Sequence, residues 1–308
     1  MSYKCFYHSS DLDGKCSAAI VKYKYPNAIL YPVDYYNSIK LEVKDEFRYY
    51  IEPLKDNKIR NDCIFFIDPD DIVIMCDFSF SLFDLMIFIK NNCKNFIWLD
   101  HHHTSINNAI KNNFKTDGML DENSSGCSLT WKYFFTEKDI PYCIELIEKY
   151  DTGNFYFNND VLHFEYGMRN RDDDEINPNN TSFWKELFEN SDLINEIINE
   201  GKICLKYQKK INKRLLKNVF QTKFGGWKCA VINYPKINSL FFEDLEDKDR
   251  YDILIGCSLD RKLQWSIFLY TEKPYINVAQ IAEMYGGGGH KNAAAFKSKE
   301  LPFKLWGI

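Results

Sequence analysis

Long apolar runs, paired cysteines and a strong excess of one charge are all missing from this sequence of 308 residues. No stretch approaches about eighteen uninterrupted apolar residues, so we expect no membrane span and no membrane partner. The ten cysteines are scattered singly from Cys5 to Cys257 without a CxxC pair, which is typical of free thiols in a reducing cytoplasm. The N-terminus has no basic segment followed by an apolar one, which argues against secretion. We therefore expect a cytoplasmic protein, and its formal charge of −5 gives no general attraction to nucleic acid.

Histidine is also scarce, yet three of the six histidines are consecutive in "WLDHHHTS" (98–105). They come directly after the apolar run "FIWL", where a buried strand is expected to end. A polar turn is one interpretation of this stretch. A metal or phosphate site at the end of a strand is the other, and the rest of the chain has to decide between them.

Short apolar runs alternate with helical patterns in the N-terminal half, which predicts a mainly parallel sheet with helices packed on both faces. The expected strands are 4–8, 28–35, 63–67, 71–78 and 94–100, and the expected helices are 14–25, 81–92, 125–137 and 142–151. This pattern places the chain in the α/β class.

The C-terminal half begins after a polar loop at 169–182 and has a different pattern. A long helical pattern covers 184–220, followed by strands at 227–234, 251–259 and 263–271 and a helix at 277–286. We predict a catalytic domain at 1–185, a helical connector at 186–222 and a smaller α/β domain at 223–308. Seven basic residues of the connector form a solvated face or a basic wall beside a phosphate site: Lys202, Lys206, Lys209, Lys210, Lys213, Arg214 and Lys217.

Acidic residues and histidines recur where the predicted elements end. His8, Asp11 and Asp13 follow the first strand, Asp77 follows "IVIMC", Asp100, His101 and His102 follow "FIWL", and Asp151 ends a helix. Taken singly, Asp11 and Asp13 could cap the helix that starts near Gly14, and Asp77 could cap the helix that starts near Ser81. Ligands of open α/β sheets bind outside the carboxyl ends of the strands, so we expect these side chains to converge on one rim.

Carboxylates and imidazoles without thiolates suit Mn²⁺, Mg²⁺, Fe²⁺, Co²⁺ or Zn²⁺. About five carboxylates are more than one ion needs, whereas two ions about 3.5–4 Å apart would use them. Such pairs serve in-line displacement at phosphorus. The sequence therefore predicts two divalent ions, with Mn²⁺ the first choice.

The set of motifs resembles the DHH phosphoesterase superfamily over nearly the whole chain. "HSSDLDG", the aspartate of "MCDFS", "DHH" within "WLDHHHTS" and the aspartate of "KYDTGN" are similar to its four ordered motifs. "YGGGGHKNAAAF" (285–296) resembles the glycine-rich signature of the DHH-associated C-terminal domain. "DHH" alone is a weak signal, but the ordered set closed by "GGGGH" is specific.

The resemblance implies a role for each matching residue. His8, Asp11 and Asp77 would hold one metal ion. The other would be held by Asp13, Asp77, His101 and Asp151, so that Asp77 bridges the two ions. His102 would face the substrate phosphate, and Asp100 would orient the neighbouring imidazole. Asp77, Asp100 and His102 are thus the expected catalytic residues, and His103 is left without a catalytic role.

The glycine run has its own alternatives. Such runs are usually linkers, and GK[ST] is absent, so this is no P-loop. The resemblance implies that Gly287, Gly288, Gly289 and His290 bind a substrate phosphate. Two departures bear on the substrate: Ala295 stands where related chains often have glycine, and a serine–arginine pair common before the loop is missing. Arg261 or the connector lysines are the candidates to replace that arginine.

We interpret the chain as a metal-dependent phosphodiesterase that degrades short single-stranded oligonucleotides, RNA or DNA, to mononucleotides, because it resembles two-domain nano-RNase and oligoribonuclease members. The alternatives are linear or cyclic dinucleotides, 3′-phosphoadenosine phosphate and, less favoured, pyrophosphate. A catalytically silent nucleotide sensor would have lost a ligand, and every ligand position is filled. The sequence leaves the oligomeric state open, a homodimer included.

Overall fold

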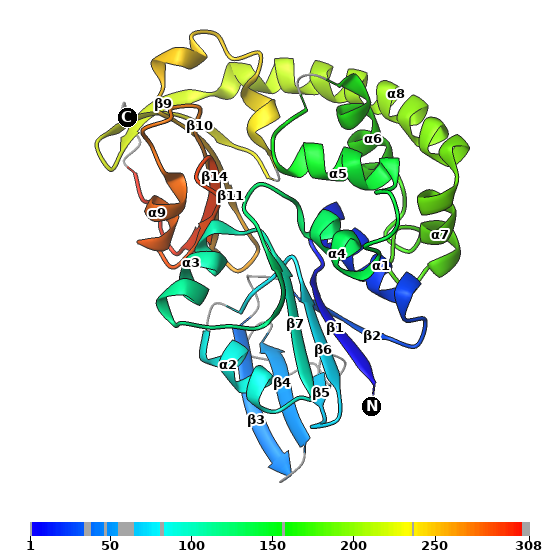
Figure 1. Cartoon of the computed structure of the whole chain (residues 1–308). Coiled ribbons are helices and arrows are strands. Elements are labelled where there is room, and N and C mark those ends of the chain that lie inside the picture. Colours follow the sequence, from blue (N-terminus) through cyan, green and yellow to red (C-terminus); the bar gives the residue numbers. More distant parts are fainter. Residues whose placement is uncertain are drawn as a thin grey trace. The chain divides into compact units, whose positions relative to one another are not determined.

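The computed structural model describes residues 2–303 apart from 34–37, 46–47, 55–64, 81–82, 156–157 and 236. For 38–45, 48–54 and 65–66 it describes the backbone alone. The chain divides into two compact units, Met1–Leu205 and Lys206–Ile308 (Figure 1). The domain boundaries expected near residues 185 and 222 stay predictions.

The first unit contains a five-stranded sheet in the order β2-β1-β6-β7-β8 (Figure 1). Its strands are β1 (Tyr3–His8), β2 (Ile29–Val33), β6 (Ile72–Cys76), β7 (Asn95–Asp100) and β8 (Asp117–Leu120). All neighbouring strands are parallel. The predicted parallel sheet is therefore confirmed, and residues 34–35 of the expected second strand lie outside the described part.

Alternate residues of the central strands point to opposite faces of the sheet, and helices bury both faces (Figure 1). Phe6, Met75 and Trp98 pack with α2 (Phe83–Asn91) and α3 (His103–Lys111). Cys5, Ile74 and Leu99 pack on the other face with α1 (Leu12–Lys24) and α4 (Gly126–Phe134). Burial on both faces explains why these strands read as continuous apolar runs.

A small antiparallel sheet also belongs to the first unit, in the order β3-β4-β5. It consists of β3 (Ser38–Asp45), β4 (Arg48–Leu54) and β5 (Phe65–Ile67). The expected strand 63–67 corresponds to β5, and its residues 63–64 lie outside the described part. The sequence interpretation did not anticipate the β3–β4 hairpin.

The remaining helices of this part of the chain are α5 (Tyr142–Asp151), α6 (Asn159–Arg169), α7 (Thr181–Glu189) and α8 (Ser191–Leu215), with a short 3-10 turn η2 (Leu216–Asn218). The single helical pattern expected over 184–220 is divided at Asn190, whose backbone is extended. The Asn190 side chain accepts a hydrogen bond from the Asp192 N–H, so it caps the start of α8. The seven basic residues along α8 and η2 are exposed, in agreement with a solvated face.

The second unit is the smaller α/β unit that the sequence predicted. Its sheet has the order β13-β14-β12-β11-β10-β9, in which β10 and β11 are parallel and the other pairs antiparallel. The strands are β9 (Phe220–Phe224), β10 (Trp227–Asn233), β11 (Ile253–Leu259), β12 (Trp265–Tyr270), β13 (Gly288–Gly289) and β14 (Ala293–Ser298). Helix α9 (Val278–Glu283) packs on one face, and the 3-10 turn η3 (Ser239–Phe242) packs on the other. A further 3-10 turn, η4 (Lys248–Arg250), precedes β11.

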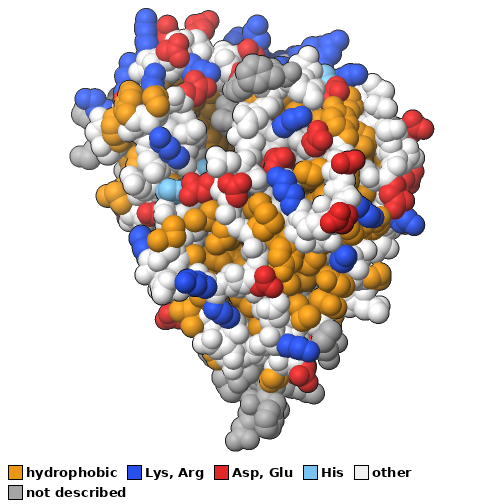
Figure 2. All heavy atoms as spheres, in the orientation of Figure 1, with side chains coloured by type: hydrophobic (Ala, Val, Ile, Leu, Met, Phe, Trp, Pro, Cys, Tyr) orange, Lys and Arg blue, Asp and Glu red, His pale blue; other side chains and the backbone are white. Residues whose placement is uncertain are grey.

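The surface and the helices give two further facts about the described residues. None of the described helices is long and apolar enough to cross a membrane. Basic and acidic side chains are mixed over the face seen in Figure 2 rather than gathered by sign.

Candidate metal centre

The carboxyl ends of β1, β6 and β7 lie at one edge of the parallel sheet and position the predicted ligands. His8 is the last residue of β1, Asp77 follows β6 directly, and Asp100 ends β7. The backbone N–H of Asp77 donates to the carbonyl of Leu99 on the neighbouring strand, at 2.8 Å. Predicted metal-binding residues that are far apart in the sequence therefore lie at one edge of the sheet, as expected for an open α/β sheet.

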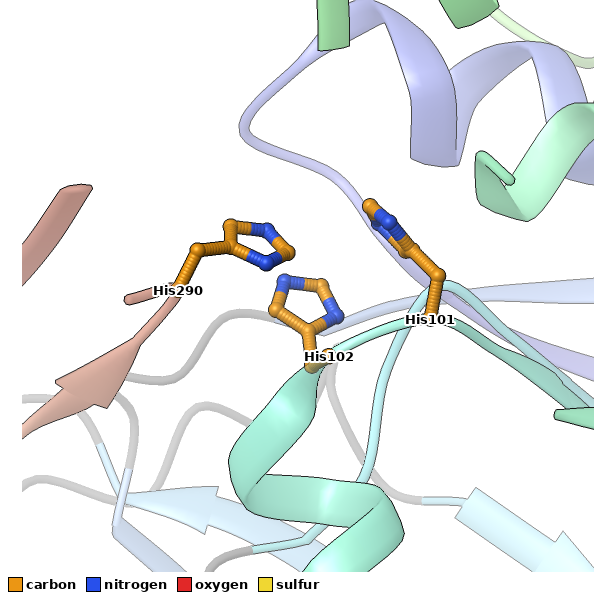
Figure 3. A group of neighbouring side chains, drawn as sticks. All are labelled: His101, His102 and His290. Carbon is orange, nitrogen blue, oxygen red and sulfur yellow. The ribbon is translucent and has the colours of Figure 1, made fainter. Parts of the chain in front are cut away.

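Three groups of possible ligand atoms overlap at this rim. They are His8, Asp11 and Asp77; Asp13, Asp77 and His101; and Asp77, Asp100 and His102, and within each group the ligand atoms lie within 4.8 Å of one another. Asp77 belongs to all three groups. Figure 3 shows His101 and His102 where the chain leaves β7 and enters α3.

The first group is built around the β1–α1 junction. Asp11 caps α1, because its Oδ1 accepts the Gly14 N–H at 3.0 Å. Its other oxygen, Oδ2, lies 2.7 Å from His8 Nδ1, and Asp77 Oδ2 lies 3.5 Å from the same nitrogen. The capping and the binding interpretation of Asp11 are therefore compatible, because each uses a different oxygen.

The second group surrounds the buried His101 ring. Its Nε2 lies 3.0 Å from Asp77 Oδ1, 3.4 Å from Asp151 Oδ2 and 3.6 Å from Asp13 Oδ2. One imidazole nitrogen thus faces three carboxylates that come from α1, the end of β6 and the end of α5. Such a set is the donor pattern of a hard or borderline divalent ion.

The third group orients His102. Asp100 Oδ1 accepts the backbone N–H groups of His101 and His102, at 2.8 and 3.2 Å, and lies 2.8 Å from His102 Nδ1. Asp100 is fully buried. The buried carboxylate therefore fixes both the backbone turn and the ring of His102, as the resemblance implied for an orienting residue.

The carboxylates of the centre perturb one another. Burial raises the pKa of Asp151 to about 6, with His101 opposing and Asp77 adding to the effect. Burial and the charges of Asp77 and Asp151 raise the pKa of Asp13 well above its usual range. Burial would also raise the pKa of Asp77, but the hydrogen bond with His101 and the nearby imidazoles of His8 and His102 hold it far below its usual range. The protein alone therefore does not stabilise all of these carboxylates in their charged form.

Unsatisfied oxygens give the test of whether a metal fits. Within the described part of the chain, three buried carboxylate oxygens have no hydrogen-bond partner: Asp77 Oδ2, Asp100 Oδ2 and Asp151 Oδ2. Buried charged oxygens are costly unless a hydrogen bond or a cation compensates them. Asp77 and Asp151 also belong to the predicted ligand set, so a bound divalent cation would satisfy them.

The N-terminus of α4 is part of the centre, and the sequence interpretation missed it. The backbone N–H groups of Gly126 and Cys127 donate to Asp13 Oδ2 and Oδ1, at 2.6 and 2.8 Å. A Cβ atom at Gly126 would lie 2.5 Å from Asp77 Cβ and 3.0 Å from Asp13 Oδ2. Only glycine fits this approach, and "SSG" at 124–126 is a helix-start signal that could have pointed to it.

His103 is bound away from the ligand groups described above. Its Nδ1 lies 2.9 Å from both carboxylate oxygens of Glu122, and its Nε2 lies 2.8 Å from the Asn107 side-chain amide. Both ring nitrogens therefore have partners within α3 and the loop that precedes α4. His103 is thus held outside these ligand groups, and its lack of a catalytic role stays a prediction.

The predicted phosphate-binding residues belong to the second unit. Gly287 to Gly289 lead through β13 to His290, whose backbone N–H donates to the Ala293 carbonyl at 2.8 Å (Figure 3). Gly289 has a φ of 138°, and a Cβ atom at Gly287 would lie 2.1 Å from the Ala295 carbonyl oxygen. The glycines thus form a tight, ordered hairpin rather than a linker. Arg261 is exposed in the turn between β11 and β12.

Comparison with known proteins bears on the fold. No family model matches the chain. An uncharacterized protein of Acanthamoeba polyphaga mimivirus is 28% identical over 316 residues, which cover 97% of this chain and 69% of that protein. The pGpG-specific phosphodiesterase PggH from Vibrio cholerae aligns with a TM-score of 0.50 and 15% identity, over 96% of this chain and 93% of that chain. Exonuclease RecJ bound to manganese aligns with a TM-score of 0.45 and 11% identity, over 96% and 85%. The likeness to PggH shows a shared α/β fold.

Proposed function

We propose that this chain is a metal-dependent phosphodiesterase of the DHH type that hydrolyses short single-stranded oligonucleotides to mononucleotides. The observation that carries the proposal is the buried carboxylate of Asp77, which three ligand groups share at the carboxyl edge of a parallel sheet. The ordered motifs and the fold shared with the phosphodiesterase PggH support it.

The donor set favours two ions over one. His8, Asp11 and Asp77 would hold one divalent ion, and Asp13, Asp77, His101 and Asp151 would hold the other. Carboxylates and imidazoles without thiolates suit several divalent ions, and Mn²⁺ is the one that we propose. When bound, such a pair lowers the pKa of an attacking water and neutralises charge on the phosphoryl oxygens.

The side chains around the ions have separate roles in this proposal. Asp100 holds the His102 ring through Nδ1, which orients this imidazole toward a phosphoryl oxygen of the substrate. The α4 N-terminus fixes Asp13 through two backbone N–H groups, so that this carboxylate is positioned before a metal binds. In the second unit, the backbone of Gly287 to Gly289 and the His290 ring bind a substrate phosphate.

Other substrates remain within the same chemistry. PggH acts on pGpG, which makes a dinucleotide the second candidate substrate for this chain. Cyclic dinucleotides, 3′-phosphoadenosine phosphate and pyrophosphate need the same ions and differ in the groups that flank the phosphate. A silent sensor is disfavoured, because each of the six predicted metal ligands carries a competent donor.

A product ladder tests the proposal. Purified protein is incubated with 5′-labelled RNA and DNA of two to about twenty nucleotides, with Mn²⁺ or with EDTA, and with pGpG, a cyclic dinucleotide and pyrophosphate in parallel. We expect Mn²⁺-dependent loss of the shortest oligomers with mononucleotides as products. Cleavage of another phosphate compound while every oligomer survives would contradict the proposed substrate. If no compound were cleaved, the proposed enzymatic activity would be contradicted.

A further inference from the structure

An arginine at the end of α6 makes more contacts than most exposed side chains do. Arg169, the last residue of α6, donates from Nε to Glu165 Oε1 at 2.8 Å and from Nη2 to the Tyr150 hydroxyl at 2.9 Å. Its guanidinium carbon also lies 5.6 Å from the Tyr150 ring centre and 5.2 Å from that of Tyr166. Two hydrogen bonds and two aromatic rings thus fix one guanidinium.

The support for this arginine is buried, whereas the arginine itself is accessible. The side chain of Glu165 is 8% exposed and that of Arg169 is 47% exposed. An exposed ion pair four residues apart on a helix contributes little stability. Here the Glu165 carboxylate is buried and the Arg169 guanidinium is accessible to solvent. A buried partner of this kind can hold an exposed cation in one position.

The guanidinium retains donors for a ligand. Arginine has five N–H donors in a planar fork, and the described residues accept from Nε and from Nη2. Within the described chain, no partner is found for Nη1. The guanidinium is held by two hydrogen bonds and still has the Nη1 hydrogens to donate. It is therefore suited to bind a phosphate, which accepts several charge-assisted hydrogen bonds.

The position of Arg169 relates it to the metal centre. Tyr150, which accepts its hydrogen bond, directly precedes the ligand Asp151 on α5. Burial raises the pKa of Glu165, Arg169 lowers it, and the charge of Asp11 raises it further, so Asp11 acts on this pair electrostatically. Among the described carboxylates, Glu165 is the one that forms an ion pair with Arg169. The guanidinium is therefore not paired with a predicted metal ligand.

We infer that Arg169 is a substrate-binding residue that holds a phosphate of the oligonucleotide next to the one that is cleaved. The inference rests on the proposed function and deepens it, because successive phosphates are what distinguish an oligonucleotide from a simple phosphodiester. Glu165 and Tyr150 are positioning residues that hold the guanidinium toward that phosphate.

The test compares two substrates that differ in the neighbouring phosphate. One is a 5′-phosphorylated diadenylate, which has a second phosphate, and the other is bis(p-nitrophenyl) phosphate, which has a single one. For Arg169→Gln we expect KM for the dinucleotide to rise about 10- to 100-fold with kcat within about twofold. Hydrolysis of bis(p-nitrophenyl) phosphate should stay within about twofold of wild type.

Two further variants separate binding from stability. Arg169→Lys keeps a charge beside Glu165 but loses the planar fork, so it should keep the wild-type Tm and raise KM for the dinucleotide about tenfold. Lys149→Gln is the matched control, because Lys149 forms an exposed pair with Glu145 four residues apart on α5, and it should behave as wild type. A wild-type KM for Arg169→Lys, or an equal loss on both substrates for Arg169→Gln, would overturn the inference.

A binding measurement distinguishes failure of the Arg169 inference from failure of the proposed function. If the wild type hydrolyses neither substrate, the proposed function fails, and calorimetric titration with the dinucleotide in Mn²⁺ decides the inference alone. Affinity that is at least tenfold weaker in Arg169→Gln supports a phosphate-binding arginine. Equal affinity in the two proteins overturns it.

Discussion

Asp77 lies after β6 with a φ of 53°, a left-handed conformation that is uncommon for residues other than glycine, although asparagine and aspartate adopt it more often than most. The sequence predicted that its carboxylate serves two ions, and the structure places it in three ligand groups. The backbone conformation could not be predicted, because it depends on the Leu99 carbonyl and on the close approach of Gly126. Strain of this kind is concentrated at functional sites, where the surrounding structure enforces it.

Replacement of Asp77 should remove the activity. For Asp77→Ala we expect kcat/KM to fall at least about a thousandfold, because a shared carboxylate contributes to both ions and metal assistance is worth several kcal/mol. Steady-state hydrolysis of a short oligonucleotide in Mn²⁺ measures the loss. His103→Ala is the control and should stay within about threefold of wild type, since its ring nitrogens contact Glu122 and Asn107. Wild-type turnover by Asp77→Ala would refute the shared-carboxylate assignment.

At the scale of elements, the sequence predicted the parallel strands and which residues follow them. Strands buried on both faces give continuous apolar runs, and their carboxyl ends share one edge, so local patterns were enough. The role of α4 could not be found in this way, because Gly126 and Asp13 are 113 residues apart and meet only in the folded chain. The break at Asn190 was missed because its capping bond interrupts an otherwise continuous helical period.

Replacement of Gly126 tests whether the N-terminus of α4 needs a glycine beside Asp77 and Asp13. Alanine is normally the better helix former by up to about 1 kcal/mol. Gly126→Ala should instead destabilise the protein by about 1–3 kcal/mol, because the new methyl group would overlap Asp77 and Asp13.

The same substitution should weaken Mn²⁺ binding. Urea unfolding and Mn²⁺ titration measure the two effects. Gly153→Ala is the control: its φ of 77° strains the backbone, but no heavy atom lies within 4 Å of the added Cβ, so Mn²⁺ affinity should be unchanged. Wild-type Mn²⁺ affinity in Gly126→Ala would show that the α4 N-terminus does not organise the centre.

For the whole molecule, the parallel sheet of the first unit and the mixed sheet of the second agree with the predicted α/β class. The resemblance assigned the chemistry to the first unit and phosphate binding to the second, and the ligands described above all lie in the first. The arginine that the resemblance expects in the second unit is missing from the sequence. Its replacement by Arg261 or by the connector lysines stays a prediction. Arg169 could not be identified from the sequence, because its position depends on α6, a helix that the sequence interpretation did not anticipate.

Mn²⁺ binding should depend on pH. The pKa values of Asp151, at about 6, and of Asp13 and His101 are all raised in the metal-free protein, so these groups hold protons that a metal must displace. Proton release makes affinity increase with pH, and we expect Mn²⁺ to bind at least about tenfold more tightly at pH 7 than at pH 5. Calorimetry at pH 5, 6 and 7 measures this. In Asp151→Asn, the affinity for Mn²⁺ should change less steeply with pH. A wild-type affinity for Mn²⁺ that does not change with pH would contradict the assignment of these residues as metal ligands.

We propose that the carboxylate and imidazole cluster around Asp77 binds two metal ions. The most direct test counts Mn²⁺ bound per chain after equilibrium dialysis and records the electron paramagnetic resonance spectrum of the loaded protein. We expect two ions per chain with a spin-coupled spectrum in the wild type, and loss of the coupled signal in Asp77→Ala. One uncoupled ion, or two ions that Asp77→Ala retains unchanged, would contradict it.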